Sequence, residues 1–248
     1  MENSIFSKAY WRAAASEIKK PRILVLAAIL ITLRVVLKLV SIPIVPGQLS
    51  ITFGFFLNAL GSMIYGPIVA LISGAITDTL GCVIAPAGGP YFFPYCLNEM
   101  LGCLLFALVL YKRDLSVPRV MLSRFAVVLG CNVLVQPVID RWYNVVFFGK
   151  NFTLLKLITM LRVFKNLALF PLECLLLVLF LRAAGPLLKT VGIHNKAETL
   201  KLKWWHIVLL VLLSLIAFLA FVVWFETASG KTNDVTAAIY AWLKGLIQ

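Results

Sequence analysis

Long apolar segments with few charges constrain this chain more than any other feature of its sequence. Several of them run for about 20 residues, the length of an α-helix that crosses the hydrocarbon core of a bilayer. Backbone polar groups in lipid must bond within the protein, so only helices or a closed barrel can span it. The apolar segments lack the alternation of barrel strands. With 62% hydrophobic residues among 248, the sequence predicts an all-α, polytopic membrane bundle.

Seven spans are expected, separated by proline, glycine or charged residues. They cover residues 22–42, 50–63, 66–83, 95–111, 119–138, 159–181 and 204–225, and continuation of the fifth toward Phe148 is left open. We therefore expect four regions, namely a cytoplasmic, interfacial N-terminal segment (1–21), a six-helix core (22–184), a basic cytoplasmic linker (185–203) and an extra transmembrane helix with an amphipathic tail (204–248). Within the first region, residues 5–18 mix aromatic and basic side chains, as a helix lying on an anionic leaflet does.

Membrane topology accounts for most of the net charge of +13. Lysine and arginine cluster before the first span, after the fourth and after the sixth, as the positive-inside rule expects of cytoplasmic segments. The charge therefore gives no reason to expect a nucleic-acid partner. This pattern predicts a multi-pass protein of the cell membrane with a cytoplasmic N-terminus. Seven spans then place the C-terminus outside.

Four cations inside the spans are the leading candidates for function: Arg34, Lys38, Arg162 and Lys165. A cation at the bilayer centre costs roughly 2.5–3.5 kcal/mol on insertion scales. All four lie in the half of the membrane assigned to the outside, and a shared anionic ligand explains that coincidence. For three of them the alternative is snorkelling to the interface, whereas Arg34 lies too deep to reach either interface easily.

Carboxylates near these cations could neutralise them or contact a ligand. Asp78 and Glu99 flank an uncharged loop, APAGGPYFFP, and Asn98 lies beside Glu99. Proline removes backbone donors and glycine loosens the backbone, so this loop (Ala85–Pro94) is not a regular helix. The three polar side chains could bond to a heterocycle under the loop. Glu173, inside the sixth span, is expected to pair with a cation within the bundle.

Small residues give the first span a second distinct face. Ala28 and Thr32 are four residues apart, with Ala27 adjacent, and they lie about 120° around the helix from Arg34 and Lys38. Small residues at this spacing allow close approach of another helix. We expect either a partner-docking face or internal packing here.

Catalytic constellations are missing from the sequence, so no catalytic residue, metal site or cofactor is expected. The five cysteines occur singly and lack metal-ligand spacing. The segment SGKT, residues 229–232, resembles the end of a phosphate-binding loop. The glycine that this motif requires is replaced by Phe225, so the chain is not expected to hydrolyse ATP.

The order of these features resembles the substrate-binding S components of energy-coupling-factor (ECF) vitamin transporters, specifically the folate group. The resemblance covers roughly residues 22–182 and is carried by the small-residue face of the first span and its basic start. It is strongest in GPIVALISGAITDTLG (Gly66–Gly81) with the loop after it, and it includes LRVFKN (Leu161–Asn166). The resemblance implies a six-helix vitamin-binding protein without ATPase. Such a protein docks on a shared membrane coupling subunit with two cytoplasmic ATPases and topples to release its substrate.

What the resemblance implies for single residues is a folate site. The docking face corresponds to Ala27, Ala28 and Thr32. The loop becomes a lid whose Tyr91, Phe92 and Phe93 cover the ligand rings, instead of a plain connection with interface anchors. Arg34, Lys38 and Arg162, with Lys165 beside them, meet the carboxylates, and Asp78 or Asn98 contacts the pterin edge.

Two alternatives to a folate-binding subunit remain open on the sequence. One is an S component for another anionic vitamin or precursor, which would use the same cations. The other is a small intramembrane enzyme acting on lipid head groups. That enzyme would need an acid–base or metal set, and the chain offers only scattered carboxylates.

Overall fold

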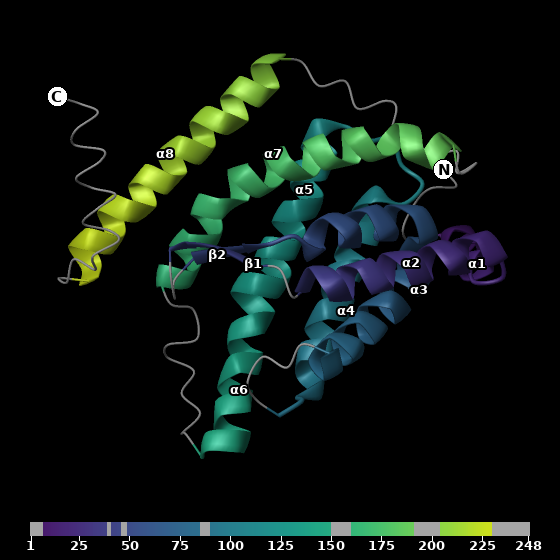
Figure 1. Cartoon of the computed structure of the whole chain (residues 1–248), viewed down its shortest axis with the longest axis horizontal. Helices are drawn as coiled ribbons and strands as arrows, with labels where there is room; N and C mark the ends of the chain where they lie inside the picture. Colours follow the sequence, from purple (N-terminus) through teal and green to yellow (C-terminus); the bar gives the residue numbers. More distant parts are fainter. Residues whose placement is uncertain are drawn as a thin grey trace.

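The computed structural model describes residues 7–38, 41–45, 49–84, 90–149, 160–190 and 204–229. Helices form nearly all of this described part (Figure 1). The elements are α1 (Lys8–Glu17), α2 (Pro21–Lys38), β1 (Ser41–Val45), β2 (Leu49–Thr52), α3 (Gly54–Ile84), α4 (Phe93–Leu110), α5 (Val117–Val127), the π-helix η1 (Val128–Val135), α6 (Gln136–Phe148), α7 (Met160–Thr190) and α8 (Trp204–Ser229).

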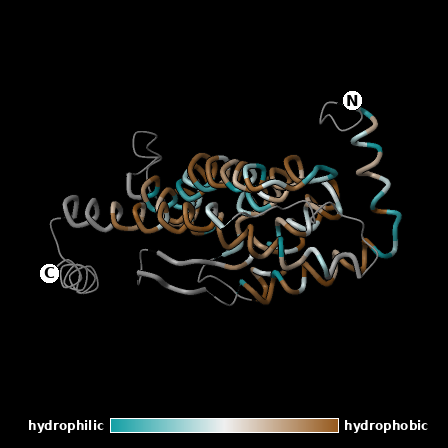
Figure 2. Tube along the Cα trace, turned by 90° about the horizontal axis from the view of Figure 1, so that it is seen from above, coloured by the Kyte–Doolittle hydropathy of each residue, from teal (hydrophilic) through white to brown (hydrophobic). Residues whose placement is uncertain are grey.

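The predicted helical membrane bundle is confirmed. Among the described residues, four helical segments are long and apolar enough to cross a membrane: Gly54–Ile84, Phe93–Leu110, Val117–Phe148 and Arg162–Pro186. A shorter apolar stretch, Ile207–Ala220, lies within α8. Hydrophobic residues dominate the bundle, whereas α1 is mixed in character and projects from one end (Figure 2). This distribution is what a multi-pass membrane protein requires.

The second and third predicted spans form a single element, α3, that is broken at Gly66. This glycine has φ 76° and ψ 179°, and Pro67 follows it. Only glycine adopts that conformation without strain, and a Cβ here would lie 2.8 Å from the Tyr111 ring. The two halves of α3 therefore remain separate helices. Together with α2 and α4, α3 forms most of the main hydrophobic core.

The predicted start of the second span at Ser50 is wrong. Residues 49–52 form β2, which pairs antiparallel with β1 through Ser41↔Thr52 and Ile42↔Ile51. Both strands are rich in β-branched residues, which favour extended backbone. The helix begins only at Gly54.

The fifth span is longer than its expected end at residue 138 and does continue to Phe148. α5, η1 and α6 follow one another without a break, so Asp140, which lies beyond the expected end of the span, is in a helix. The intervening segment is a π-helix, a form that is frequent at functional sites. Its i→i+5 bonding widens the turn and changes which side chains face the bundle.

The C-terminal part of the described structure is a pair of helices, α7 and α8, that lie at an angle to one another in Figure 1. α7 reaches Thr190, so residues 185–190 of the expected linker are helical, and residues 191–203 lie outside the described residues. α8 packs on α7 through Leu210. Large apolar side chains remain exposed around its other sides, as lipid contact requires. The amphipathic tail after residue 229 also lies outside the described residues.

At the other end of the chain, the expected N-terminal helix is present as α1. Its buried side chains are Tyr10, Ala14 and Glu17, and the Tyr10 ring meets Tyr111 edge to face with centroids 5.7 Å apart. The Tyr111 hydroxyl donates to Glu17 at 3.2 Å. Burial, together with the negative charge of Glu17, raises the pKa of Tyr111, so this phenol stays protonated and able to donate. α1 is therefore attached to the turn that follows α4.

Candidate functional site

A polar cavity of about 290 Å³ lies inside the apolar bundle. It is bounded by α2, α3, α4, α5 and η1, and it is lined by Leu37, Lys38, Gly54, Phe55, Asn58, Asn98, Glu99, Gly102, Phe106, Arg124, Val127, Cys131 and Asn132. Charged and amide side chains thus share the wall with two phenylalanine rings. Polar groups buried in an apolar bundle are costly unless they are paired or bind something, so this cavity is the candidate ligand site.

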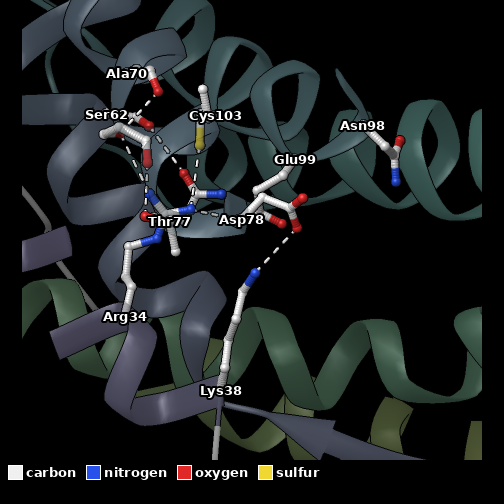
Figure 3. Close-up of polar contacts among 12 residues, drawn as sticks. Arg34, Lys38, Ser62, Ala70, Thr77, Asp78, Asn98, Glu99 and Cys103 are labelled. Atoms are coloured by element: carbon white, nitrogen blue, oxygen red, sulfur yellow. Dashed lines mark hydrogen bonds and ion pairs between the residues drawn. The ribbon is translucent and has the colours of Figure 1, made fainter. Parts of the chain in front are cut away.

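Arg34 supports the cavity from behind. The residue as a whole is 1% exposed, and its Nη2 lies 2.5 Å from Oε1 of Glu99, which lines the cavity. The guanidinium also donates to Ser73 Oγ and Cys103 Sγ, both at 3.4 Å. Figure 3 shows Arg34 reaching from α2 toward Cys103 and Glu99. Arg34 is therefore placed to hold the Glu99 carboxylate and does not itself line the cavity.

Lys38 lies on the cavity wall one turn beyond Arg34. Its Nζ is 3.3 Å from Oδ1 of Asp78, as the dashed line in Figure 3 marks. The lysine stem passes close over α3, where a Cβ on Gly81 would meet Lys38 Cδ at 2.8 Å. A glycine at this position is what lets the lysine lie flat between the ends of the two helices. Asp78 contacts the site through Lys38 and does not line the cavity.

A second buried arginine was not singled out from the sequence. Arg124 lines the cavity, and its Nη2 lies 2.8 Å from Oε2 of Glu173 on α7. Its guanidinium carbon is 4.2 Å from the centroid of the Phe55 ring, a cation–π contact. The expected pairing of Glu173 within the bundle is confirmed. Arg124 was overlooked because it lies near the basic end of its span, where topology alone accounts for a cation.

Arg162 belongs to a hydrogen-bonded chain that ends at the cavity. Its Nη2 is 2.6 Å from Oδ2 of Asp140. Gln136 Nε2 donates to Asp140 Oδ1 at 3.0 Å, and Asn98 Nδ2 donates to Gln136 Oε1 at 2.6 Å. Asn98 lines the cavity, whereas Arg162 does not line it and reaches the wall through this chain and through a 3.5 Å bond from its Nη1 to the backbone carbonyl of Asn132. Lys165 is half-buried near Arg162 and forms no ion pair within the described ranges.

Unlike Lys165, each of the four other cations at or near the cavity has a carboxylate partner. The four pairs are Arg34–Glu99, Lys38–Asp78, Arg124–Glu173 and Arg162–Asp140. Arg34 and Arg162 do not line the cavity, whereas Lys38 does, and direct contact of these cations with an anionic ligand stays a prediction. In the described part of the chain, the cavity surroundings are therefore close to neutral without any ligand.

The three loop aromatics are placed differently from one another. Phe92 is half-buried against rings of α4 and α6, with centroid distances of 5.4 Å to Trp142 and 5.8 Å to Phe147. Tyr91 and Phe93 are exposed, at 43% and 59%. Residues 85–89 of the loop lie outside the described residues. None of the three lines the cavity, so the described part of the loop borders the site without closing over it.

The small residues of α2 do not share one face. Ala28 and Thr32 are exposed, with the Thr32 hydroxyl turned back to the Ala28 carbonyl at 2.9 Å. Ala27 is 5% exposed and belongs to the core. The exposed face of α2 therefore contains Ala28 and Thr32 between larger apolar side chains, and Ala27 packs internally.

Several cavity residues had no signal in the sequence that distinguished them. Asn58 and Asn132 are ordinary amides in apolar runs, and neither charge nor spacing marks them. Glu99 is expected from the sequence either to neutralise a cation or to bond to a heterocycle, but it is not assigned to the predicted folate site. Considering every polar residue within a span, and not only the cations, finds Asn58 and Asn132 as well. No group of three or more His, Cys, Asp or Glu side chains suited to a metal occurs in the described residues.

A multi-pass helical bundle with a polar, charge-matched cavity defines a membrane protein that binds a small polar molecule. The chain belongs to the family described as the substrate-specific component of ECF transporters, whose family model matches residues 22–181. That family is a transporter component and not an enzyme, which removes the lipid-enzyme alternative.

Relatives of this chain include folate transporters. It is 30% identical to the folate transporter FolT of Clostridium novyi (strain NT) over 162 residues, covering 64% of this chain and 87% of the relative. It is 38% identical over 96 residues to FolT of Streptococcus mutans, covering 39% and 51%. A crystal structure of FolT bound with folic acid matches with a TM-score of 0.50 and 27% identity, over 62% of this chain and 87% of that one.

Proposed function

We propose that this chain is the high-affinity membrane binding subunit for folate uptake, and that it delivers folate through a shared coupling subunit with two cytoplasmic ATPases. The observation that carries the proposal is the Glu99 carboxylate, held at the wall of a polar cavity by a buried arginine. A pterin ring presents neighbouring N–H donors on one edge. A carboxylate with two acceptor oxygens matches that edge.

The size and charge of the cavity set the orientation of the ligand. At about 290 Å³, it lies at the small end of ligand pockets and holds a ring system more readily than a whole folate. Phe55 and Phe106 supply apolar wall for the flat ring. Lys165, near the start of α7, forms no ion pair within the described ranges, so we place the dianionic glutamate tail at the outer end of the site.

The residues at the outer end of the site are then available to bind the glutamate tail and to cover the ligand. Lys38 can leave Asp78 for a ligand carboxylate, because a lysine on a flexible stem exchanges partners easily. Lys165 and Arg162 at the start of α7 are further candidates for the tail. Tyr91 and Phe93, exposed beside the site, are available to cover it.

Docking and topology complete the proposal. The exposed face of α2 with Ala28 and Thr32 is the surface for the coupling subunit, because small residues permit close helix contact. Ala27 supports that face from inside the core. The N-terminus is placed in the cytoplasm and the C-terminus outside, following the lysine and arginine clusters.

A direct test is calorimetric titration of the purified full chain with folate, after mass spectrometry of any small molecule that co-purifies. We expect saturable one-to-one binding, and loss of most affinity in Glu99→Gln. Co-purification of a different vitamin, with no binding of folate, would support the alternative S component. In liposomes the chain alone should show no ATP-driven uptake, whereas adding the coupling subunit and its ATPases should produce it.

A further inference from the structure

Gln136 occupies a position that neither the sequence nor the comparisons single out. We propose that Gln136 is a positioning residue that fixes the Asn98 side-chain amide, so that the Asn98 carbonyl oxygen is the acceptor offered to a ligand N–H. This inference rests on the proposed folate function. It concerns how the same cavity selects its ligand.

Asp140, at the end of the hydrogen-bonded series farthest from the cavity, decides which groups donate and which accept. Asp140 can only accept hydrogen bonds when ionised, and it receives them from Tyr95 Oη at 3.0 Å, from Gln136 Nε2 at 3.0 Å and from Arg162 Nη2 at 2.6 Å. Gln136 must therefore turn its NH₂ group toward Asp140. Its carbonyl oxygen is then left to face Asn98.

The orientation of Gln136 in turn decides the orientation of the Asn98 side-chain amide at the cavity wall. The Gln136 carbonyl can only accept, so the Asn98 NH₂ group donates to it at 2.6 Å. The Asn98 carbonyl oxygen, at the opposite side of that amide, is buried and has no hydrogen-bond partner among the described residues. A buried unsatisfied acceptor costs roughly 1–3 kcal/mol. A ligand donor that reaches it removes this cost, whereas a ligand acceptor at the same place does not.

The fold supplies the reason that Gln136 is in reach. The π-helix η1 ends at Val135, immediately before it. Its wide turn puts both Cys131 and Asn132 on the cavity wall, and the next turn brings Gln136 to Asn98. The hydrogen-bonded series from Asn98 to Arg162 connects α4, α6 and α7, so residues on other helices hold the Asn98 side chain in place.

A double-mutant cycle between Asn98 and Gln136 tests the proposal. Gln136→Met keeps the length of the side chain without hydrogen bonding, and Gln136→Glu keeps its shape but cannot donate to Asp140 when ionised. Folate affinity is measured for each variant in the native background and in the Asn98→Ala background. Val138→Ala, an exposed position on the same helix, is the matched control. Melting of the ligand-free proteins confirms that each one folds.

In the native background, each Gln136 variant is expected to weaken folate binding about tenfold, the effect of one well-oriented hydrogen bond. In the Asn98→Ala background the same change should have almost no effect, because there is no amide left to orient. Equal losses in both backgrounds would show that Gln136 merely holds helices together, and would overturn the inference. If the native chain does not bind folate at all, the proposed function fails first and this inference fails with it.

Discussion

Arg34 of α2 and Glu99 of α4 form an ion pair, with 2.5 Å between Nη2 and Oε1, at the wall of the polar cavity. The arginine side chain is 2% exposed and the glutamate side chain 32%. The pair therefore presents its carboxylate to the cavity and hides its cation. The buried arginine of α2 thus holds the glutamate of α4 in place as a hydrogen-bond acceptor at the cavity wall.

Arg34→Ala should lower folate affinity at least about tenfold, although Arg34 does not line the cavity. Without the guanidinium, Glu99 loses its partner and is free to rotate away from the cavity. Titration of the purified variant measures the loss, and Arg22→Ala, exposed at the start of the same helix, serves as the control. An unchanged dissociation constant in folded Arg34→Ala would separate Arg34 from the site.

Removing one partner of the Arg124–Glu173 pair should destabilise the protein more than removing both. Glu173→Met leaves a buried arginine without its carboxylate, which costs about 3–5 kcal/mol, whereas replacing a whole buried pair by apolar residues is often nearly neutral. Melting curves in detergent should therefore place Arg124→Met/Glu173→Met close to the native protein. Folate affinity should stay low in that double variant, because Arg124 lines the cavity. Full recovery of both properties would exclude Arg124 from binding.

Phe92 and Phe93 should respond differently to replacement by alanine. Phe92 contacts the rings of Tyr95, Trp142, Tyr143 and Phe147, so Phe92→Ala should lower the melting temperature of the ligand-free protein. Phe93 is exposed, so Phe93→Ala should leave it unchanged. Stopped-flow measurement of folate release then decides the role of the loop. Faster release from Phe93→Ala supports a lid, and unchanged release from both variants supports a plain connection with an anchor.

Two tyrosines at the contact between α1 and the end of α4, Tyr10 and Tyr111, form a matched pair for stability. Tyr111→Phe removes a hydrogen bond to the buried Glu17 carboxylate, and bonds to charged groups contribute about 1.5–3 kcal/mol. The Tyr10 hydroxyl is buried without a hydrogen-bond partner in the described residues, so Tyr10→Phe should be neutral or stabilising. Thermal melting of the two variants measures the difference. Equal destabilisation by both would contradict the arrangement of α1 on α4.

Local signals in the sequence predicted much of the helical fold correctly. The break at Gly66 followed from a Gly–Pro pair, and the long apolar runs gave the spans that the structure contains. The hairpin before α3 was missed because its two strands are short apolar runs, and runs of this length do not distinguish strand from helix. The extension through Phe148 was only left open, since a π-helix has no sequence signature of its own.

The sequence by itself determined that this chain is a helical membrane protein, and which of its cations interrupt the apolar runs. Those facts follow from the length of apolar runs and from the cost of charge in lipid, both of which are local. Only the tertiary structure decided which carboxylate meets each cation. Arg34 and Glu99 are 65 residues apart, as distant partners in a packed bundle commonly are, and no periodicity within one helix encodes the face of another. For the same physical reason Asn58, Arg124 and Asn132 became cavity residues only when their helices were brought together.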